Sequence, residues 1–158
     1  MKDREKILRY FAATGEEAKE MAIRLLDIAD TVDRGRPFAV GPFMSPFAAQ
    51  VGQTVAAHMN TVTVRISGGY HEAERIRVAF LRNDYEGPVD FGMTALSVTW
   101  DDRYRLIGHR DVLGSLMGLG IERSVLGDIL MTGAGCQIVA DAGIAERHIK
   151  NFEKVTID

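Results

Sequence analysis

The stretch Gly108–Leu130, which reads GHRDVLGSLMGLGIERSVLGDIL, constrains the fold more than any other part of the sequence. Its apolar residues recur at the spacings of one helix face, at Val112, Leu113, Leu116 and Met117. Gly120 can adopt the left-handed conformation that ends a helix, and Ile121 can then fold back onto Leu116 in a Schellman motif. The pattern therefore predicts a well-defined helix over 109–119.

The elements around this helix are predicted in the order β-α-β-β-α-β. Strands are expected at Thr94–Trp100, Asp128–Met131 and Cys136–Ala140, with a glycine-containing turn between the last two. Asp141 is expected to cap a second helix, with a final strand over 155–157. The second helix has four apolar residues on one face, at Ile144, Ala145, Ile149 and Phe152. This order is that of a ferredoxin-like (RRM-like) α/β plait, which we assign to residues 88–158.

Residues 1–87 are predicted to form a separate helical module with a strand pair. One helix, or two, is expected over 3–30, and the capping-box spacing of Thr14 and Glu17 favours a second helix from Gly15 to about Ala29. The whole chain is therefore an α+β protein with a domain boundary at 87/88.

The segment Phe38–Asn60 contains no Asp, Glu, Lys or Arg. Ser45 and Pro46 form a typical helix start, so a buried helix is one interpretation of this segment. The alternative is an exposed apolar surface for a partner, formed by Phe38, Phe43, Met44 and Phe47. After it, alternating residues over 62–66 and 75–80 predict a hairpin with Tyr70 and His71 at its tip.

Composition excludes several classes of protein. Of the 158 residues, 46% are hydrophobic and 26% are charged, which is typical of a globular protein. No apolar run approaches the roughly 20 residues of a membrane span, and no signal peptide is evident at the start, so we expect a cytoplasmic protein with no membrane partner. Cys136 is the only cysteine, so no intramolecular disulfide can form.

RNA is a candidate ligand because RRM-like sheets bind it, but the predicted strands carry no stacking aromatics, and Trp100 is expected to pack in the core. Phosphate contacts from basic groups and helix starts are then the better expectation. The candidate RNA-binding residues are His109, Arg110, Ser115, Arg123, Arg75 and Arg77. Each has a structural alternative; for Arg110 this is an ion pair with Glu74 or Asp128. The net charge of −3 does not favour RNA binding.

Catalysis is not expected. The triplet His109-Arg110-Asp111 looks like a catalytic group, but neighbours on a helix point about 100° apart and cannot converge on one atom. The sequence shows no phosphate-binding loop, no dinucleotide-binding glycine motif and no metal-ligand spacing. We therefore expect no catalytic residue, no metal, no cofactor and no small-molecule substrate.

Two long motifs, HRDVLGSLMGLGIERSVLGDIL and GGYHEAERIRVAFL at Gly68–Leu81, resemble the bacterial YlmH (RqcP-like) family. The resemblance covers nearly the whole chain. It implies a non-enzymatic RNA-binding protein of ribosome-associated quality control, with ribosomal RNA or tRNA on the large subunit as partners. Such proteins also carry a C-terminal S-four-type RNA-binding domain, so the chain is expected to be a fragment. The alternative is a protein-interaction or spacer module, with that domain alone binding RNA.

Overall fold

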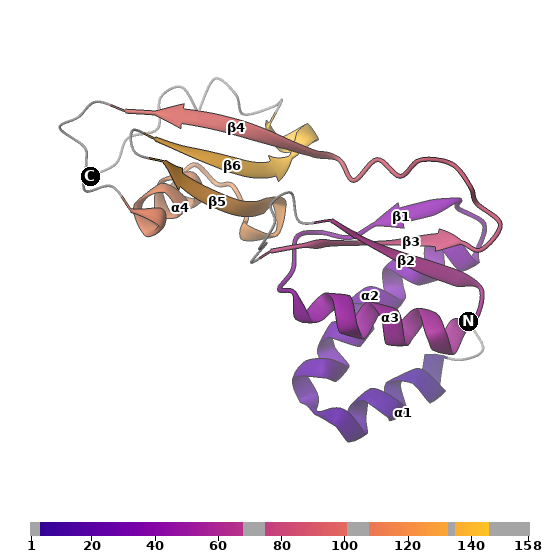
Figure 1. Cartoon of the computed structure of the whole chain (residues 1–158). Helices are drawn as coiled ribbons and strands as arrows, with labels where there is room; N and C mark the ends of the chain where they lie inside the picture. Colours follow the sequence, from indigo (N-terminus) through magenta and orange to yellow (C-terminus); the bar gives the residue numbers. More distant parts are fainter. Residues whose placement is uncertain (1–3, 68–74, 101–107, 133–134, 146–158) are drawn as a thin grey trace. The chain divides into compact units, whose positions relative to one another are not determined.

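The computed structural model describes residues 4–67, 75–100, 108–132 and 135–145. The described residues fall into two compact units, which divide at Phe91 and Gly92. Each unit combines helices with a three-stranded antiparallel sheet (Figure 1). The predicted α+β class is therefore confirmed. The predicted hairpin tip at Tyr70 and His71 lies outside the described residues, and the predicted domain boundary at 87/88 stays a prediction.

Three helices build one side of the first unit: α1 (Arg4–Thr14), α2 (Glu16–Asp33) and α3 (Phe47–Met59). Gly15, with a φ of 144°, separates α1 from α2, so the first thirty residues form two helices. The second helix continues past the predicted end at Ala29, because the fully buried Val32 extends its apolar stripe by one turn. The third begins directly after Pro46, as predicted.

The sheet of the first unit has the order β1-β3-β2, formed by β1 (Phe38–Val40), β3 (Arg77–Arg82) and β2 (Val62–Ser67). Strands β2 and β3 pair antiparallel with Val64 opposite Phe80, which confirms the predicted pairing. Strand β1 was not predicted, because three residues are too few to show an alternation. It pairs with the other edge of β3, where Phe38 lies opposite Leu81.

Strand β3 is buried on both faces. Val78 and Phe80 lie toward the helices, next to Gly52 of α3. The opposite face is covered by the segment 83–91, which curves over the sheet on the side away from α2 and α3 (Figure 1). Its Tyr85 ring packs on Phe38 with ring centroids 5.6 Å apart. We call residues 83–91 the strap.

The region before α3 is part of the core. Phe43 and Met44 are 1% and 3% exposed, and Phe38 and Phe47 are half-buried. Met44 also bridges to Ile76 through backbone hydrogen bonds. The buried interpretation of Phe38–Asn60 is confirmed, and the alternative of an exposed apolar partner surface is wrong.

The sheet of the second unit has the order β4-β6-β5, with β4 (Met93–Thr99), β6 (Gly135–Asp141) and β5 (Leu126–Thr132). Helix α4 (His109–Gly118) packs on one face, and a short 3-10 helix, η2 (Arg123–Val125), leads into β5. Between helix and sheet lies a core of buried residues: Val112, Leu116, Ile121, Leu126, Ile129, Cys136, Ile138, Ala140 and Ala145.

The C-terminus of α4 has the predicted geometry. Gly120 has a φ of 85° and donates its N–H to the Met117 carbonyl at 3.0 Å. Ile121 donates its N–H to the Leu116 carbonyl at 3.4 Å, and both side chains are buried in the same cluster. These are the hydrogen bonds and the apolar contact of a Schellman motif.

The described elements of the second unit follow the order β-α-β-β, with the last strand in the middle of the sheet. Asp141 Oδ1 accepts the Ile144 N–H at 3.1 Å, which confirms the predicted cap of the next helical turn. The rest of that helix and the predicted final strand lie outside the described residues. A complete ferredoxin-like plait therefore stays a prediction.

Candidate nucleic-acid interface

The start of α4 is organised by its own aspartate. Gly108 is extended and donates its N–H to Asp111 Oδ2 at 2.8 Å, while the Asp111 N–H donates to the Gly108 carbonyl at 3.1 Å. A carboxylate in the first turn also complements the positive end of the helix dipole. Helix formation at this point needs no contribution from the neighbouring Arg110.

Arg110 is exposed at this helix start. Within the described part of the chain, no ion pair or hydrogen bond holds its guanidinium, and the alternative of a pair with Asp128 is not observed. The other alternative partner, Glu74, lies outside the described residues, as does the side chain of His109. Arg110 is therefore available to a negatively charged ligand.

Glycines occupy the solvent face of α4. Residues at spacings of four, Arg110, Gly114 and Gly118, are all exposed, with Met117 beside them at 49% exposure. A Cβ added at Gly114 or Gly118 would meet no described atom within 4 Å, so packing against the described residues does not explain these glycines. Each costs the helix about 1 kcal/mol relative to alanine. They leave helix backbone open to close approach.

The exposed residues on the outer face of the second sheet are all uncharged: Ala95, Ser97, Thr99, Leu130, Thr132 and Gln137. Ser97 and Leu130 lie on either side of Gln137 in the register. None of the three described strands carries an aromatic residue, and Trp100 packs against the core, as expected. This face offers shape and hydrogen bonds, with no ring on which a base could stack.

Two further candidate residues of the second unit are partly buried. Arg123 Nη1 donates to the carbonyls of Leu126 and Gly127 at 2.8 and 3.2 Å, which ties η2 to the first residues of β5. Ser115 is half-buried on α4. Both lie in the same unit as Arg110, and Arg123 has a structural task there.

The candidates Arg75 and Arg77 belong to the first unit and hold its loops. Arg75 Nη2 donates to the Phe43 carbonyl at 2.8 Å. Arg77 is 6% exposed; its Nη1 donates to the Phe91 carbonyl at 2.7 Å, and its guanidinium lies 4.4 Å from the centre of the Phe43 ring. The prediction that Arg77 lies on the polar side of its strand is wrong, because the strap covers that face.

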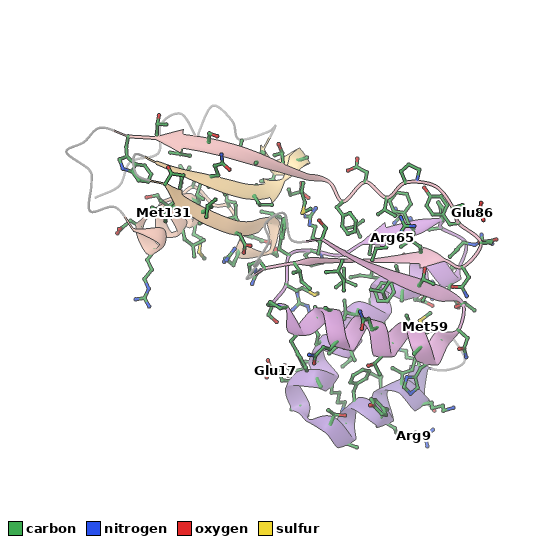
Figure 2. The ribbon with its side chains drawn as sticks, viewed as in Figure 1. Arg9, Glu17, Met59, Arg65, Glu86 and Met131 are labelled. Carbon is green, nitrogen blue, oxygen red and sulfur yellow. The ribbon has the colours of Figure 1, made fainter. Side chains whose placement is uncertain are left out.

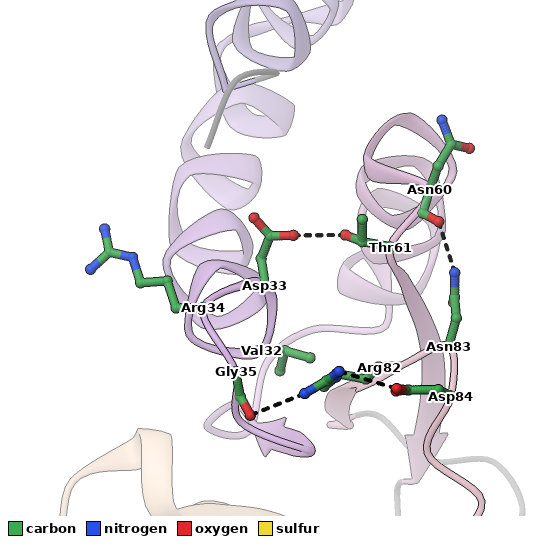
Figure 3. Close-up of a pocket in the computed structure, with 9 residues that line it drawn as sticks. All are labelled: Val32, Asp33, Arg34, Gly35, Asn60, Thr61, Arg82, Asn83 and Asp84. Atoms are coloured by element: carbon green, nitrogen blue, oxygen red, sulfur yellow. Dashed lines mark hydrogen bonds and ion pairs between the residues drawn. The ribbon is translucent and has the colours of Figure 1, made fainter.

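An open pocket of about 440 Å³ lies where α2 and α3 end, in the first unit. Figure 3 shows hydrogen bonds and an ion pair among several of the residues that line it. Thr61 donates to Asp33 at 2.9 Å, Asn83 donates to the Asn60 carbonyl at 2.7 Å, and Arg82 pairs with Asp84 at 3.1 Å. The first two bonds join the ends of α2 and α3 to residues next to β2 and β3.

Among the described residues, no group of three histidine, cysteine or acidic side chains could hold a metal ion. No helix within the same ranges has the length and apolar character needed to cross a membrane.

Comparison with protein families gives two matches that adjoin along the chain. Residues 17–85 match the family model "YlmH, N-terminal", and residues 87–157 match the model "Putative RNA-binding domain in YlmH". The α+β fold and the second match place this chain in a class of proteins with an RNA-binding domain. The chain belongs to the YlmH family.

A curated relative from Bacillus subtilis, "Ribosome-associated protein quality control protein P2", is 38% identical over 87 residues. The matched region is 54% of this chain and 34% of the relative, so the chain matches about a third of the relative's length. A solved structure, "Cell division protein ylmH from Streptococcus pneumoniae", has the same fold with a TM-score of 0.69 at 22% identity. That alignment covers 90% of this chain and 86% of the other.

Proposed function

We propose that this chain is a non-enzymatic RNA-binding protein that acts on the ribosome, and that the solvent face of α4 is its RNA contact. The observation that carries the proposal is the combination of Arg110, which has no partner among the described residues, with exposed glycines on the same helix face. A guanidinium can bind a phosphate through two parallel hydrogen bonds. Bare backbone beside it lets the sugar-phosphate chain approach closely.

The RNA partner we propose is ribosomal RNA or tRNA on the large subunit, in ribosome-associated quality control. The name of the Bacillus subtilis relative supports the process, and the family match over 87–157 supports the ligand class. Contacts to phosphates and groove shape suit the second unit, because its described strands lack aromatic residues.

The candidate residues take different places in this proposal. Arg110 and His109 contact phosphate at the helix start, while Ser115 and Arg123 position or flank that contact. Arg75 and Arg77 act through the fold of the first unit, since their guanidinium groups bind the carbonyls of Phe43 and Phe91.

The test is Arg110→Ala, assayed with a structured RNA hairpin over a range of salt concentrations. An exposed arginine at a helix start contributes little to stability, so the melting temperature should hardly change. The affinity for RNA should fall equally for all RNA sequences. The slope of log affinity against log salt concentration should decrease by the contribution of about one phosphate contact. Unchanged affinity and slope in a normally folded variant would remove Arg110 from the interface.

A protein-interaction or spacer module is the competing function, and the lack of charge at the exposed positions of the second sheet favours it. Salt separates the two functions, because phosphate binding weakens steeply as salt rises whereas apolar docking changes little. A wild-type chain that binds neither ribosomes nor structured RNA at low salt would leave the interaction module as the better account.

A further inference from the structure

An aromatic pair lies on the surface of the first unit, between α1 and α3. Tyr10 is 50% exposed, and its ring centroid lies 5.0 Å from that of His58 at an angle of 49°. The Tyr10 ring also meets the buried Phe11 edge-on, with centroids 5.2 Å apart. A large aromatic residue is thus held by two neighbouring rings while half of its surface stays exposed.

Contacts with neighbouring residues fix the orientation of both rings. His58 Nδ1 lies 2.8 Å from the Thr54 carbonyl, a hydrogen-bond distance that sets the orientation of the imidazole. Phe11 is 4% exposed and fixes the other flank. Rings that are already oriented lose little conformational freedom when a flat ligand stacks on them.

Positive charge accompanies the pair. Lys6 lies one helical turn before Tyr10, and Arg9 is its direct neighbour; both are exposed and make no ion pair with any described residue. Figure 2 shows Arg9 extending from α1 into solvent. Around the helix, Lys6 lies about 40° and Arg9 about 100° from Tyr10, while Glu5, the one acid of α1, lies about 140° from Tyr10 and one turn before Arg9. By contrast, Arg4 on the same helix is paired with Asp27 at 3.1 Å.

The α3 side of this surface adds no opposing charge, because the sequence from 38 to 60 contains no Asp or Glu. Stacking rings with cations beside them form the pattern by which proteins bind single-stranded nucleic acid: rings take the bases, and cations take the phosphates. The second sheet lacks such rings in its described strands.

We propose that Tyr10 and His58 form a stacking platform for an unpaired base of single-stranded RNA, with Lys6 and Arg9 binding the adjacent phosphates. The inference rests on the proposed RNA-binding function and adds a second surface with a different RNA preference. Helix α4 contacts the backbone of structured RNA, and the platform takes an exposed single-stranded nucleotide.

The experiment uses the full chain and two fluorescein-labelled probes, a single-stranded oligoadenylate and a blunt RNA hairpin with a short tetraloop. Tyr10→Ala should weaken oligoadenylate binding about tenfold, whereas Tyr10→Phe should keep it, because the ring face provides the stacking. Tyr10→Leu retains apolar volume without a π face, so it should fail like alanine even if alanine lowers the melting temperature.

The contribution of charge is tested with the double variant Lys6→Gln/Arg9→Gln. This variant should lower the slope of log affinity against log salt concentration for oligoadenylate by the contribution of about two phosphate contacts. Arg24→Gln, on an exposed arginine of α2, is the matched control and should leave the slope within about half a phosphate of wild type.

The outcomes separate this inference from the proposed function. Oligoadenylate affinity that is the same in wild type, Tyr10→Ala and Tyr10→Leu overturns the platform, and so does a wild-type chain that does not bind oligoadenylate at low salt. Arg110→Ala should weaken the hairpin and leave oligoadenylate nearly unchanged. If Tyr10→Ala weakens oligoadenylate while Arg110→Ala changes neither probe, the platform stands and the α4 interface fails.

Discussion

The two sheets of this protein have the same plan and different surroundings. Each has three antiparallel strands with the last strand in the middle, in the orders β1-β3-β2 and β4-β6-β5. In the first unit the middle strand β3 is buried on both faces, under the helices and under the strap. In the second unit, β4 alternates between half-buried and exposed residues, and Gln137 of the middle strand faces solvent.

Cover by other parts of the fold decides whether an arginine binds protein groups or is open to a ligand. Under the strap, Arg77 is enclosed and its guanidinium binds the carbonyl of Phe91. On α4, Arg110 has no cover and no partner among the described residues, so its charge is directed to solvent. These residues are all arginines, so residue type does not distinguish them. Their exposure, which the layers of the fold set, separates the structural arginines from the candidate ligand contacts.

Gly135→Ala should have the largest effect on the second unit. A Cβ at this position of β6 would overlap the backbone carbonyl of Val98 on the neighbouring strand β4, so the strands would have to separate. We expect a loss of about 3 kcal/mol in unfolding free energy. Fluorescence of Trp100 reports on this unit alone, because Trp100 is the single tryptophan and packs against its core.

The thiol of Cys136 provides a second measurement of the same change. It is buried, and burial raises the pKa of the thiol, so alkylation at neutral pH should be slow in the folded protein. Gly135→Ala should accelerate it. Equal alkylation rates in variant and wild type, with an unchanged melt, would contradict the predicted steric overlap.

Arg77→Ala should have the next largest effect on stability, and it should destabilise the first unit. The change removes a charged hydrogen bond to Phe91 and a cation–π contact with Phe43, and it leaves a void beneath the strap. We expect a loss of about 2 kcal/mol, followed by far-ultraviolet circular dichroism in urea. Arg65→Ala on the exposed part of neighbouring β2 is the control and should cost less than about 0.5 kcal/mol.

Asp141→Ala should cost about 1 kcal/mol in the second unit. The carboxylate accepts the Ile144 N–H at 3.1 Å, and loss of an N-cap typically has this magnitude. Asp141→Asn retains a capping oxygen and should recover most of the loss. Equal stability of alanine and asparagine variants in urea titrations followed by Trp100 would mean that the cap contributes little.

Gly114→Ala should have the smallest effect on stability, with the opposite sign. The position is helical, exposed and surrounded by open space, so alanine should stabilise α4 by about 0.5–1 kcal/mol. If RNA approaches the bare backbone, the same variant should bind the hairpin RNA more weakly despite its greater stability. A more stable variant with wild-type affinity would show that the glycine face makes no close contact.

Local patterns in the sequence were sufficient for most elements. Gly120 and Ile121 identified the end of α4, and Asp141 identified the next helix start, because both motifs depend on hydrogen bonds within a few residues. Pairing of β2 with β3 also followed from their alternation. Strand β1 was missed, because its pairing partner β3 lies about forty residues further along the chain.

The sequence by itself determined the α+β class, the end of α4 and the presence of arginines within Gly108–Leu130 and on β3. Only the tertiary structure decided which of those arginines is enclosed, since burial depends on contacts with other segments, such as the strap and the Phe43 ring, 34 residues away from Arg77. The pair of Tyr10 and His58 likewise joins helices 48 residues apart and has no signature along the chain. Side-chain partners across elements are set by packing, which no short sequence window contains.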